Sequence, residues 1–334
     1  MGLADFPRID DFGDAAAEAR ACRDNCALFD FSFLECARLK GTGAKDVVEK
    51  FTGRSLAALD PGRIFYALRV NATGAVIADI TVWRIAEDSY AVMSGRREDV
   101  VDLLRQAGSE VEVTDVTNDI AVLALQGPRA LDVLSQLGDT SHLRSLGYFS
   151  FSQASLNDTP CRVGRLGYTG EAGFEIILPR AAKENFWRTW SRLARPAGFT
   201  AADMLRIEAG FVLFDNEFRV PVSPEEAGLG RFYRPGSFGW PPLTLISFCA
   251  EANTLSLPWQ PSGDLRRPVK FGEILVTSAC RSNAAGRILG LGYVRADTEA
   301  GTSLHDPTGT FQNIRRTPLP FYDTAKRRPR IAWR

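Results

Sequence analysis

Apolar and polar residues alternate along the first 120 residues with two different periods, which indicate helices and strands in turn. Alanines and charged residues at helical spacing predict a short helix over 14–26, and residues 43–51 follow the same pattern. The next predicted elements are a strand over 64–70, a hairpin turn at 71–74, strands over 75–83 and 90–93, a helix over 98–107 and a strand over 111–116. Together they predict a compact α+β unit.

The second half of the chain continues this mixed pattern and then changes character. Its predicted elements are strands at 120–125, 149–155, 161–166 and 174–178, and helices at 128–137, 181–193 and 201–209, with Pro128 in a first helical turn. Residues 235–261 are rich in Pro, Ser and aromatics without a clear period, as is typical of an interdomain region joined to a domain edge. After Pro268, short apolar runs alternate with Gly, Asn and Asp, which predicts an all-β module.

Residues Gly164–Leu178 concentrate glycine, one tyrosine and two carboxylates between two apolar runs. Glycine permits a positive φ and the close approach of a backbone or a ligand, so the segment predicts a tight connection between strands. The pattern of 174–178 places Glu175 among apolar neighbours, where a carboxylate is costly without hydrogen-bond donors. A structural hairpin without a ligand is the alternative.

Asp79 is a second carboxylate in an apolar strand. It lies within Val76–Ile80, where an acidic residue is unfavourable unless it has a task or a partner. The alternative is a bulge or an edge strand in which Asp79 faces water. The two histidines, His142 and His305, lack a neighbouring Ser, Cys or Asp in a catalytic pattern, so carboxylates and tyrosines must carry any reaction.

Composition favours a globular protein of two or three domains, because 334 residues with 45% hydrophobic and 24% charged residues can bury large cores. Forty basic and forty acidic residues cancel, which gives no reason to expect a nucleic-acid partner. We expect no membrane partner and a cytoplasmic location, since no apolar run spans a bilayer and Met1–Asp14 lacks a signal-peptide pattern. The six scattered cysteines predict buried free thiols, without a metal site.

The run Gly167–Glu175 resembles the signature of the glycine-cleavage T-protein (aminomethyltransferase) family of tetrahydrofolate-dependent one-carbon transferases. Further segments similar to family motifs follow in the same order along the chain: Leu28–Ser32, Gly74–Val82, Leu123–Ala130, Leu205–Gly210 and Pro224–Leu229. Six ordered matches are more specific than any single one. The resemblance covers roughly residues 25–230 well and 270–325 loosely.

The resemblance implies an α+β fold with three domains around a central cleft. It implies a discontinuous folate-binding domain over 1–33 and 120–235, an inserted α+β domain over 34–119 that carries the catalytic aspartate, and a C-terminal β-barrel domain over 236–334. The implied cofactor is tetrahydrofolate. The implied partner is a small-molecule methyl or aminomethyl donor.

The resemblance also implies roles for individual residues. Asp79 matches the catalytic aspartate, which would orient the donor, stabilise positive charge that develops on it, or relay a proton. Glu175 matches the glutamate that accepts the ring N–H and the exocyclic amine of the pterin. Tyr66, Tyr148 and Tyr168 match tyrosines that line the folate pocket, although each alone is more often a core residue.

Arg206 matches an arginine of the family's Arg-Leu-Glu-Ala helix, and its alternative is a structural ion pair with Glu208 or Asp203. Two departures change the expected pocket: family members usually have an arginine where this chain has Ala202, and an asparagine at the predicted cofactor-binding position Ser94. Losing a cation and an amide argues against the standard glycine-cleavage reaction. We therefore favour a paralogue, such as a demethylase, that moves a one-carbon group from an N-, O- or S-methyl or aminomethyl donor to tetrahydrofolate.

Other functions and partners follow less directly from the sequence. A non-enzymatic folate-binding protein of the iron–sulfur-maintenance branch would carry a Lys-Gly-Cys-Tyr-x-Gly-Gln-Glu motif, which is missing. A degenerate scaffold or subunit that kept the fold but lost folate stays open. A lipoyl carrier protein, which glycine cleavage requires, is not favoured because no docking surface is evident. The basic segment Lys326–Arg330 is expected to be a solvated tail, with a patch for an anionic partner as the alternative.

Overall fold

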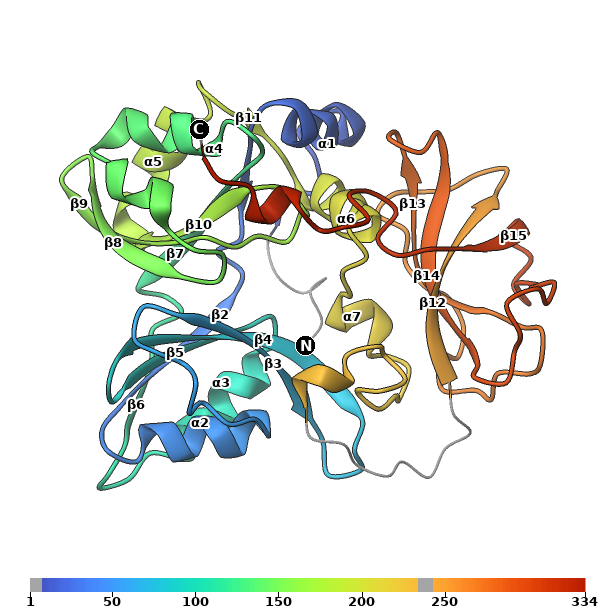
Figure 1. Cartoon of the computed structure of the whole chain (residues 1–334), viewed down its shortest axis with the longest axis horizontal. Helices are drawn as coiled ribbons and strands as arrows, with labels where there is room; N and C mark the ends of the chain where they lie inside the picture. The colour runs from blue at the N-terminus through green and yellow to red at the C-terminus, as the bar shows by residue number, and fades with distance from the viewer. Residues whose placement is uncertain (1–7, 234–242, 334) are drawn as a thin grey trace. The chain divides into compact units, whose positions relative to one another are not determined.

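The computed structural model describes residues 8–233 and 243–333 (Figure 1). By its internal contacts the chain divides into two compact units. The first unit comprises Met1–Ala67, Ile80–Ala202 and Lys326–Arg334, and the second comprises Leu68–Asp79 and Asp203–Ala325. Within the described residues the strands form three sheets, and no helix there is long and apolar enough to cross a membrane.

The largest sheet belongs to the first unit and has the strand order β11-β1-β7-β10-β9-β8. Its strands are β1 (Ala27–Asp30), β7 (Ile120–Gln126), β8 (Phe151–Leu156), β9 (Thr159–Gly164), β10 (Gly173–Pro179) and β11 (Arg195–Pro196). Neighbouring strands are antiparallel except for β1 and β11. Strand β7 is a nearly continuous apolar run, as expected for a central strand that is buried on both faces.

Two helices of the first unit, α4 (Ala130–Leu134) and α5 (Lys183–Trp190), pack on β7 and form the main core with this sheet. Phe186 and Trp190 lie one helical turn apart on α5, so both rings reach the core face and are buried there. Each large aromatic side chain removes about 150–250 Å² of surface from water, which makes this face a main source of stability. The helix predicted over 181–193 is confirmed, with shorter bounds.

The second sheet has the order β3-β4-β5-β2-β6. Its strands are β2 (Glu35–Lys40), β3 (Ile64–Val70), β4 (Val76–Ala86), β5 (Ser89–Ser94) and β6 (Glu112–Asp115), and the helices α2 (Ala44–Thr52) and α3 (Arg97–Leu104) pack on it. The side chain of Asn71 accepts hydrogen bonds from the backbone amides of Thr73 and Ala75, which closes the predicted hairpin between β3 and β4. The end of this hairpin, Leu68–Asp79, is grouped with the second unit.

The third sheet lies in the second unit and has the antiparallel order β13-β14-β12-β15. Its strands are β12 (Leu243–Glu251), β13 (Leu275–Ser282), β14 (Arg287–Arg295) and β15 (Gln312–Thr317), and the short helix α7 (Phe214–Glu217) packs on β13. The predicted all-β module is therefore present as a sheet, and its closure into a barrel stays a prediction. Of the 235–261 region expected to be irregular, residues 235–242 lie outside the described residues, whereas 243–251 form a regular strand.

The remaining helices connect these layers. They are α1 (Ala15–Asp24), α6 (Phe199–Glu208) and the 3-10 turns η2 (Ser135–Leu137), η3 (Ser141–Ser145), η4 (Arg180–Ala182), η5 (Gly230–Phe232) and η6 (Arg328–Arg330). Asp14 caps α1 by accepting a hydrogen bond from the amide of Ala17 at 2.9 Å. The helix expected to have Pro128 in its first turn begins at Ala130 instead and continues as a 3-10 turn.

Each sheet lies within one of the three predicted segments, 1–33 with 120–235, 34–119 and 236–334, while the division into three domains stays a prediction. The prediction of a solvated basic tail was wrong. Residues Lys326–Trp333, called the C-terminal strap below, belong to the first unit by their contacts. Arg328 forms an ion pair of 2.7 Å with Glu171, whose side chain is almost completely buried.

Candidate functional site

Gln126, the last residue of β7, organises the glycine-rich connection between β9 and β10. Its Nε2 donates to the carbonyl oxygens of Leu166 at 3.1 Å and Phe174 at 3.3 Å, and its Oε1 accepts from the hydroxyl of Thr169 at 2.9 Å. A Cβ at Gly167 would collide with this amide group. The close approach of one buried side chain therefore explains why glycine is needed here.

Glu175 lies in the middle of β10, opposite Ala124 of β7 and Gly164 of β9. Its side chain is buried, with 8% of the residue exposed, and no residue that the structure describes donates a hydrogen bond to its carboxylate. Burial without a donor raises the pKa of Glu175 to about 7. The apolar setting inferred from the sequence is thus observed, and ionisation of this carboxyl is costly unless a ligand supplies donors.

Tyr148 lies in the same region as Glu175. Burial raises the pKa of Tyr148 to about 12, the charge of Arg330 opposes this rise, and the charge of Glu175 adds to it. The guanidinium carbon of Arg330 lies 5.5 Å from the centre of the tyrosine ring. The structure therefore brings two predicted cofactor-binding residues together, and Tyr148 stays neutral near pH 7.

The C-terminal strap holds the glycine-rich connection at two points. Glu171 accepts from Arg328 at 2.7 Å and from Arg23 of α1 at 2.9 Å, so one buried carboxylate joins the strap to the N-terminal helix. The ring of Trp333 stacks on Phe174 with centroids 5.2 Å apart and an interplanar angle of 17°. Phe174 directly precedes Glu175 in β10, so the strap supports the strand that carries the buried carboxylate.

Asp79 lies in β4, half-buried between the buried residues Ala78 and Ile80. In the sheet order β4 lies between β3 and β5, and its register with β5 begins at Ile80, one residue after Asp79. The register shift between β4 and β5 falls between Arg84 and Ala86, away from Asp79. The catalytic assignment of Asp79 stays a prediction.

Tyr66 lies in a strand, whereas Tyr168 lies in a loop. Tyr66 lies in β3, where its carbonyl oxygen accepts a hydrogen bond of 2.7 Å from Arg54, and Tyr168 lies in the glycine-rich connection. Both residues are half-buried, so each ring keeps an accessible surface. Their assignment to a folate pocket stays a prediction.

Arg206 is completely buried in the second unit, where it forms ion pairs of 2.8 Å with Asp203 and 3.0 Å with Glu217. Its guanidinium also donates to the hydroxyl of Ser278 on β13 at 2.6 Å. This geometry favours the structural ion pair that the sequence left as the alternative to a ligand contact. A guanidinium without exposed surface cannot reach a ligand in this arrangement.

Ser94 is buried at the end of β5, just before α3. Its hydroxyl donates to Asp99 at 2.6 Å and accepts from the amide of Arg96 at 3.1 Å. These bonds connect the strand to the first turn of the helix, so the side chain of Ser94 has a local structural role whatever its role toward a ligand. The other departure from the family pattern, Ala202, is also buried.

Sequence reasoning missed Gln126 and the ion pairs that join Arg23, Glu171 and Arg328. In the sequence, Glu171 appeared only as the second carboxylate of the glycine-rich run. Its two partners lie 148 and 157 residues away, so no local spacing could identify them.

Comparison with known proteins gives consistent results. The sequence model of the GCVT N-terminal domain matches residues 4–235. An aminomethyltransferase of Saccharopolyspora erythraea is 32% identical over 93% of this chain and 90% of its own, and one of Streptomyces avermitilis is 29% identical over 94% and 91%. The crystal structure of glycine cleavage system aminomethyltransferase T from Bartonella henselae shares the fold, with a TM-score of 0.75 and 23% identity over 93% of this chain and 90% of that one.

The fold and the site define a mixed α/β protein with several sheets and an isolated carboxylate in a glycine-rich hairpin. The chain belongs to the glycine cleavage T-protein (aminomethyltransferase) family. The resemblance noted in the sequence is thereby confirmed over most of the chain. Aminomethyltransferases of this family use tetrahydrofolate, in agreement with the predicted cofactor.

Proposed function

We propose that this protein transfers a one-carbon group from a small N-, O- or S-methyl or aminomethyl donor to tetrahydrofolate. The observation that carries the proposal is the state of Glu175, a buried carboxylate in the family's glycine-rich signature with no donor among the described residues. Structural carboxylates in protein cores are normally hydrogen-bonded or ion-paired, as Glu171 and Glu217 are here. An unsatisfied one favours a role in ligand binding.

Glu175 suits the edge of a pterin, which presents a ring N–H and an exocyclic amine side by side. Two oxygens of one carboxylate accept both hydrogens in a bidentate pair, with the ionised acid acting as the acceptor. Tyr148 supplies an aromatic face in the same region, and Tyr66 and Tyr168 are proposed to complete the pocket walls. Tetrahydrofolate, when bound, supplies the nitrogen nucleophile that receives the one-carbon group.

Asp79 is proposed to act on the donor rather than on the folate. Its carboxylate would orient the donor, stabilise positive charge that develops there, or relay a proton. Proximity between donor and acceptor supplies much of the acceleration in such a transfer, so positioning is the main task of the chain.

The nature of the donor rests on the departures from the family pattern. Ala202 stands where family members usually have an arginine, and Ser94, which stands where they usually have an asparagine, bonds to Asp99 within its own unit. These losses favour a methyl donor, as in a demethylase, over the aminomethyl group of the standard reaction with a lipoyl carrier protein. The same two observations favour the second candidate, a folate-free scaffold or subunit.

A tetrahydrofolate titration separates the transferase from the scaffold. Calorimetry with the full-length protein is expected to show binding by the wild type, weaker binding by Glu175→Gln, and unchanged binding by Glu87→Gln, a matched change at an exposed position. Turnover is then followed with an N-methylamine, a methyl ether, a methyl thioether and an aminomethyl thioether as donors. Absence of binding by the wild type would contradict the proposal and leave the scaffold.

A further inference from the structure

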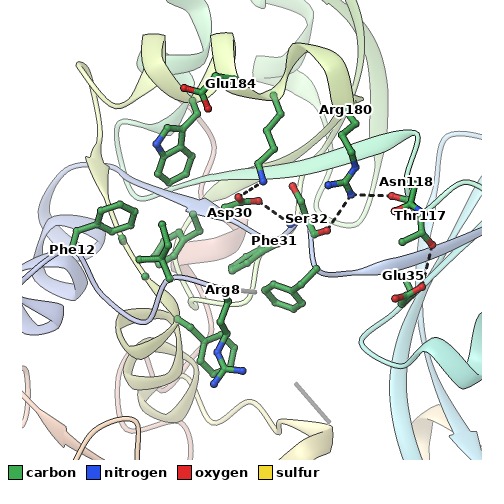
Figure 2. A pocket seen from close by; sticks show the side chains of 18 residues that line it. Arg8, Phe12, Asp30, Phe31, Ser32, Glu35, Thr117, Asn118, Arg180 and Glu184 are labelled. Atoms are coloured by element: carbon green, nitrogen blue, oxygen red, sulfur yellow. Dashed lines mark hydrogen bonds and ion pairs between the residues drawn. The ribbon is translucent and has the colours of Figure 1, made fainter. Parts of the chain in front are cut away.

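We propose that the first unit holds a second small-molecule site, which takes a compound with a flat apolar body and a carboxylate. The site is a cavity of about 620 Å³ (Figure 2). This volume lies within the usual range of roughly 300–1,000 Å³ for small-molecule pockets. Its lining residues all belong to the first unit. They come from the start of the described chain, the end of β1 and the segment up to the start of β2, the segment before β7, η4 with α5, and the start of α6 with the residues before it.

The inner wall of the cavity is a row of aromatic rings. Phe31 contacts Phe33 with ring centroids 5.9 Å apart, and Phe33 contacts Phe199 at 6.2 Å, both edge to face. Phe31 and Phe199 are buried, while Phe33 is partly exposed. The guanidinium carbon of Arg8 lies 4.3 Å from the centre of the Phe199 ring and covers one of its faces, so Phe31 and Phe33 provide the apolar surface for a ligand ring.

A second pair of rings stands at the more open part of the cavity. Phe12 stacks on Trp187 of α5 with centroids 5.8 Å apart and an interplanar angle of 27°. Phe12 is 37% exposed, so part of this ring pair contacts solvent. Together with the inner row, the pair surrounds a space suited to a planar apolar group rather than to a sugar or an extended polar chain.

The charged residues that line the cavity are nearly all paired within the protein. The pairs are Lys183 with Asp30 at 2.5 Å, Glu35 with Arg97 at 2.8 Å, Glu184 with Arg188 at 3.6 Å and Arg8 with Asp10 at 3.3 Å. The lining carboxylates are thus already paired with cations, so they offer little net negative charge to a cationic ligand.

Arg180 is the exception among the charged lining residues that the structure describes, because no carboxylate there pairs with it. Its Nη2 donates to the carbonyl oxygens of Ser32 at 3.3 Å and Thr117 at 2.9 Å, whereas its Nε is buried without a partner. Figure 2 shows Arg180 beside Ser32 and Thr117, at the opposite end of the lining from Phe12. Both hydrogens of Nη2 are used in these bonds, so Nη1 is the group left to donate a charge-assisted hydrogen bond to a ligand carboxylate.

This cavity is distinct from the region proposed to bind the pterin. None of Tyr148, Tyr168 and Glu175 is among its lining residues. The proposal of a second site is therefore independent of the proposed folate site, and a change at Glu175 should leave ligand binding at the second site unchanged.

The test uses 2-naphthoate as the probe, titrated calorimetrically into the full-length protein. Wild type is expected to bind the acid at least tenfold more tightly than the neutral 2-naphthamide. Arg180→Gln is expected to weaken naphthoate binding at least tenfold, and Arg129→Gln, a change at a cation that is 63% exposed at the N-cap of α4, is expected to have no effect. Glu175→Gln is expected to bind naphthoate as the wild type does.

A second variant guards against a folding defect, since Arg180 also holds two backbone carbonyls. Phe12→Ala removes a partly exposed ring that stacks on Trp187, and it is expected to weaken naphthoate binding about threefold or more while changing the melting temperature by only a few degrees. Absence of naphthoate binding by the wild type at millimolar concentration would overturn the proposal. Equal affinity for the acid and the amide, or binding that survives both Arg180→Gln and Phe12→Ala, would overturn it as well.

Discussion

Replacing Glu175 by Gln is the most informative single change, because it alters the charge of the buried carboxyl while scarcely changing its volume. In the wild type the pKa of Glu175 rises from 4.5 to about 7 because of burial. In a pterin complex the ionised acid would accept two hydrogens, whereas the glutamine amide would present one acceptor and one opposing donor. The same variant therefore tests both the electrostatics of the empty site and its proposed ligand.

The effect on stability follows from proton linkage. Below pH 4.5 the carboxyl is protonated in the folded and the unfolded chain, so it contributes no pH dependence. Between pH 4.5 and 7 only the unfolded chain ionises, so the free energy of unfolding falls as the pH rises. Above pH 7 the loss is complete, and a difference of about 2.5 units corresponds to about 3 kcal/mol.

The expected result is a change in the pH profile of melting. Between pH 5 and pH 8 the wild type should lose about 5–10 °C more in melting temperature than Glu175→Gln does, since 1 kcal/mol corresponds to about 2–4 °C for a unit of this size. Thermal unfolding of both proteins in matched buffers measures this difference directly. All other titrating groups are shared, so their contributions cancel.

Glu175→Gln should weaken tetrahydrofolate binding, although it should stabilise the folded protein above pH 7. Loss of a charge-assisted hydrogen bond together with a mispaired buried group costs about 2–4 kcal/mol, or about 30- to 1,000-fold in tetrahydrofolate affinity. Wild-type affinity should also fall about tenfold for each pH unit below 7, because the neutral acid must lose its proton to bind, and the variant should lack this slope. Parallel pH profiles for the two proteins, together with equal affinities, would refute the reasoning.

Three further changes test other parts of the structure. Asp79→Asn should reduce kcat while leaving tetrahydrofolate affinity within about tenfold, and unchanged turnover would remove its catalytic assignment. Arg206→Met should lower the free energy of unfolding by about 3–5 kcal/mol because it leaves buried carboxylates unpaired, whereas the exposed control Arg129→Met should lower it by about 0.5 kcal/mol or less. Denaturant titration measures both values, and equal losses would contradict the structural role of Arg206. Trp333→Ala should cost about 2–3 kcal/mol, and a loss no larger than that of the exposed control Leu193→Ala would contradict the role of the strap.

Local patterns predicted much of the framework because the periods of strands and helices are set by neighbours in sequence. The hairpin at Asn71, the strand that carries Glu175 and the helix that carries Trp190 all follow from such patterns. The strand at the start of β12 was not predicted, since its apolar residues lie among Pro and Ser without a clear alternation. The helix after Pro128 starts two residues later than expected, which is the usual uncertainty of a helix boundary.

The site was less predictable because its contacts join distant segments. That Glu175 lies in an apolar setting could be inferred from five residues, yet the absence of a donor among the described residues required the full arrangement. For Arg206 the sequence motif suggested a contact with a ligand, whereas its buried ion pair with Glu217 favours a structural role. The cavity beside Arg180 has no sequence pattern, because its walls come from separate stretches of the chain.

The C-terminal strap has a consequence for how the protein is made. The first unit includes Lys326–Trp333, although the rest of that unit ends at Ala202, about 120 residues earlier. At roughly 5–20 residues per second, a ribosome needs about 6–25 s to synthesise the intervening second unit. During that interval Glu171 lacks Arg328, and Phe174 lacks the ring of Trp333. The nascent first unit therefore lacks these contacts until the C-terminal strap has been synthesised.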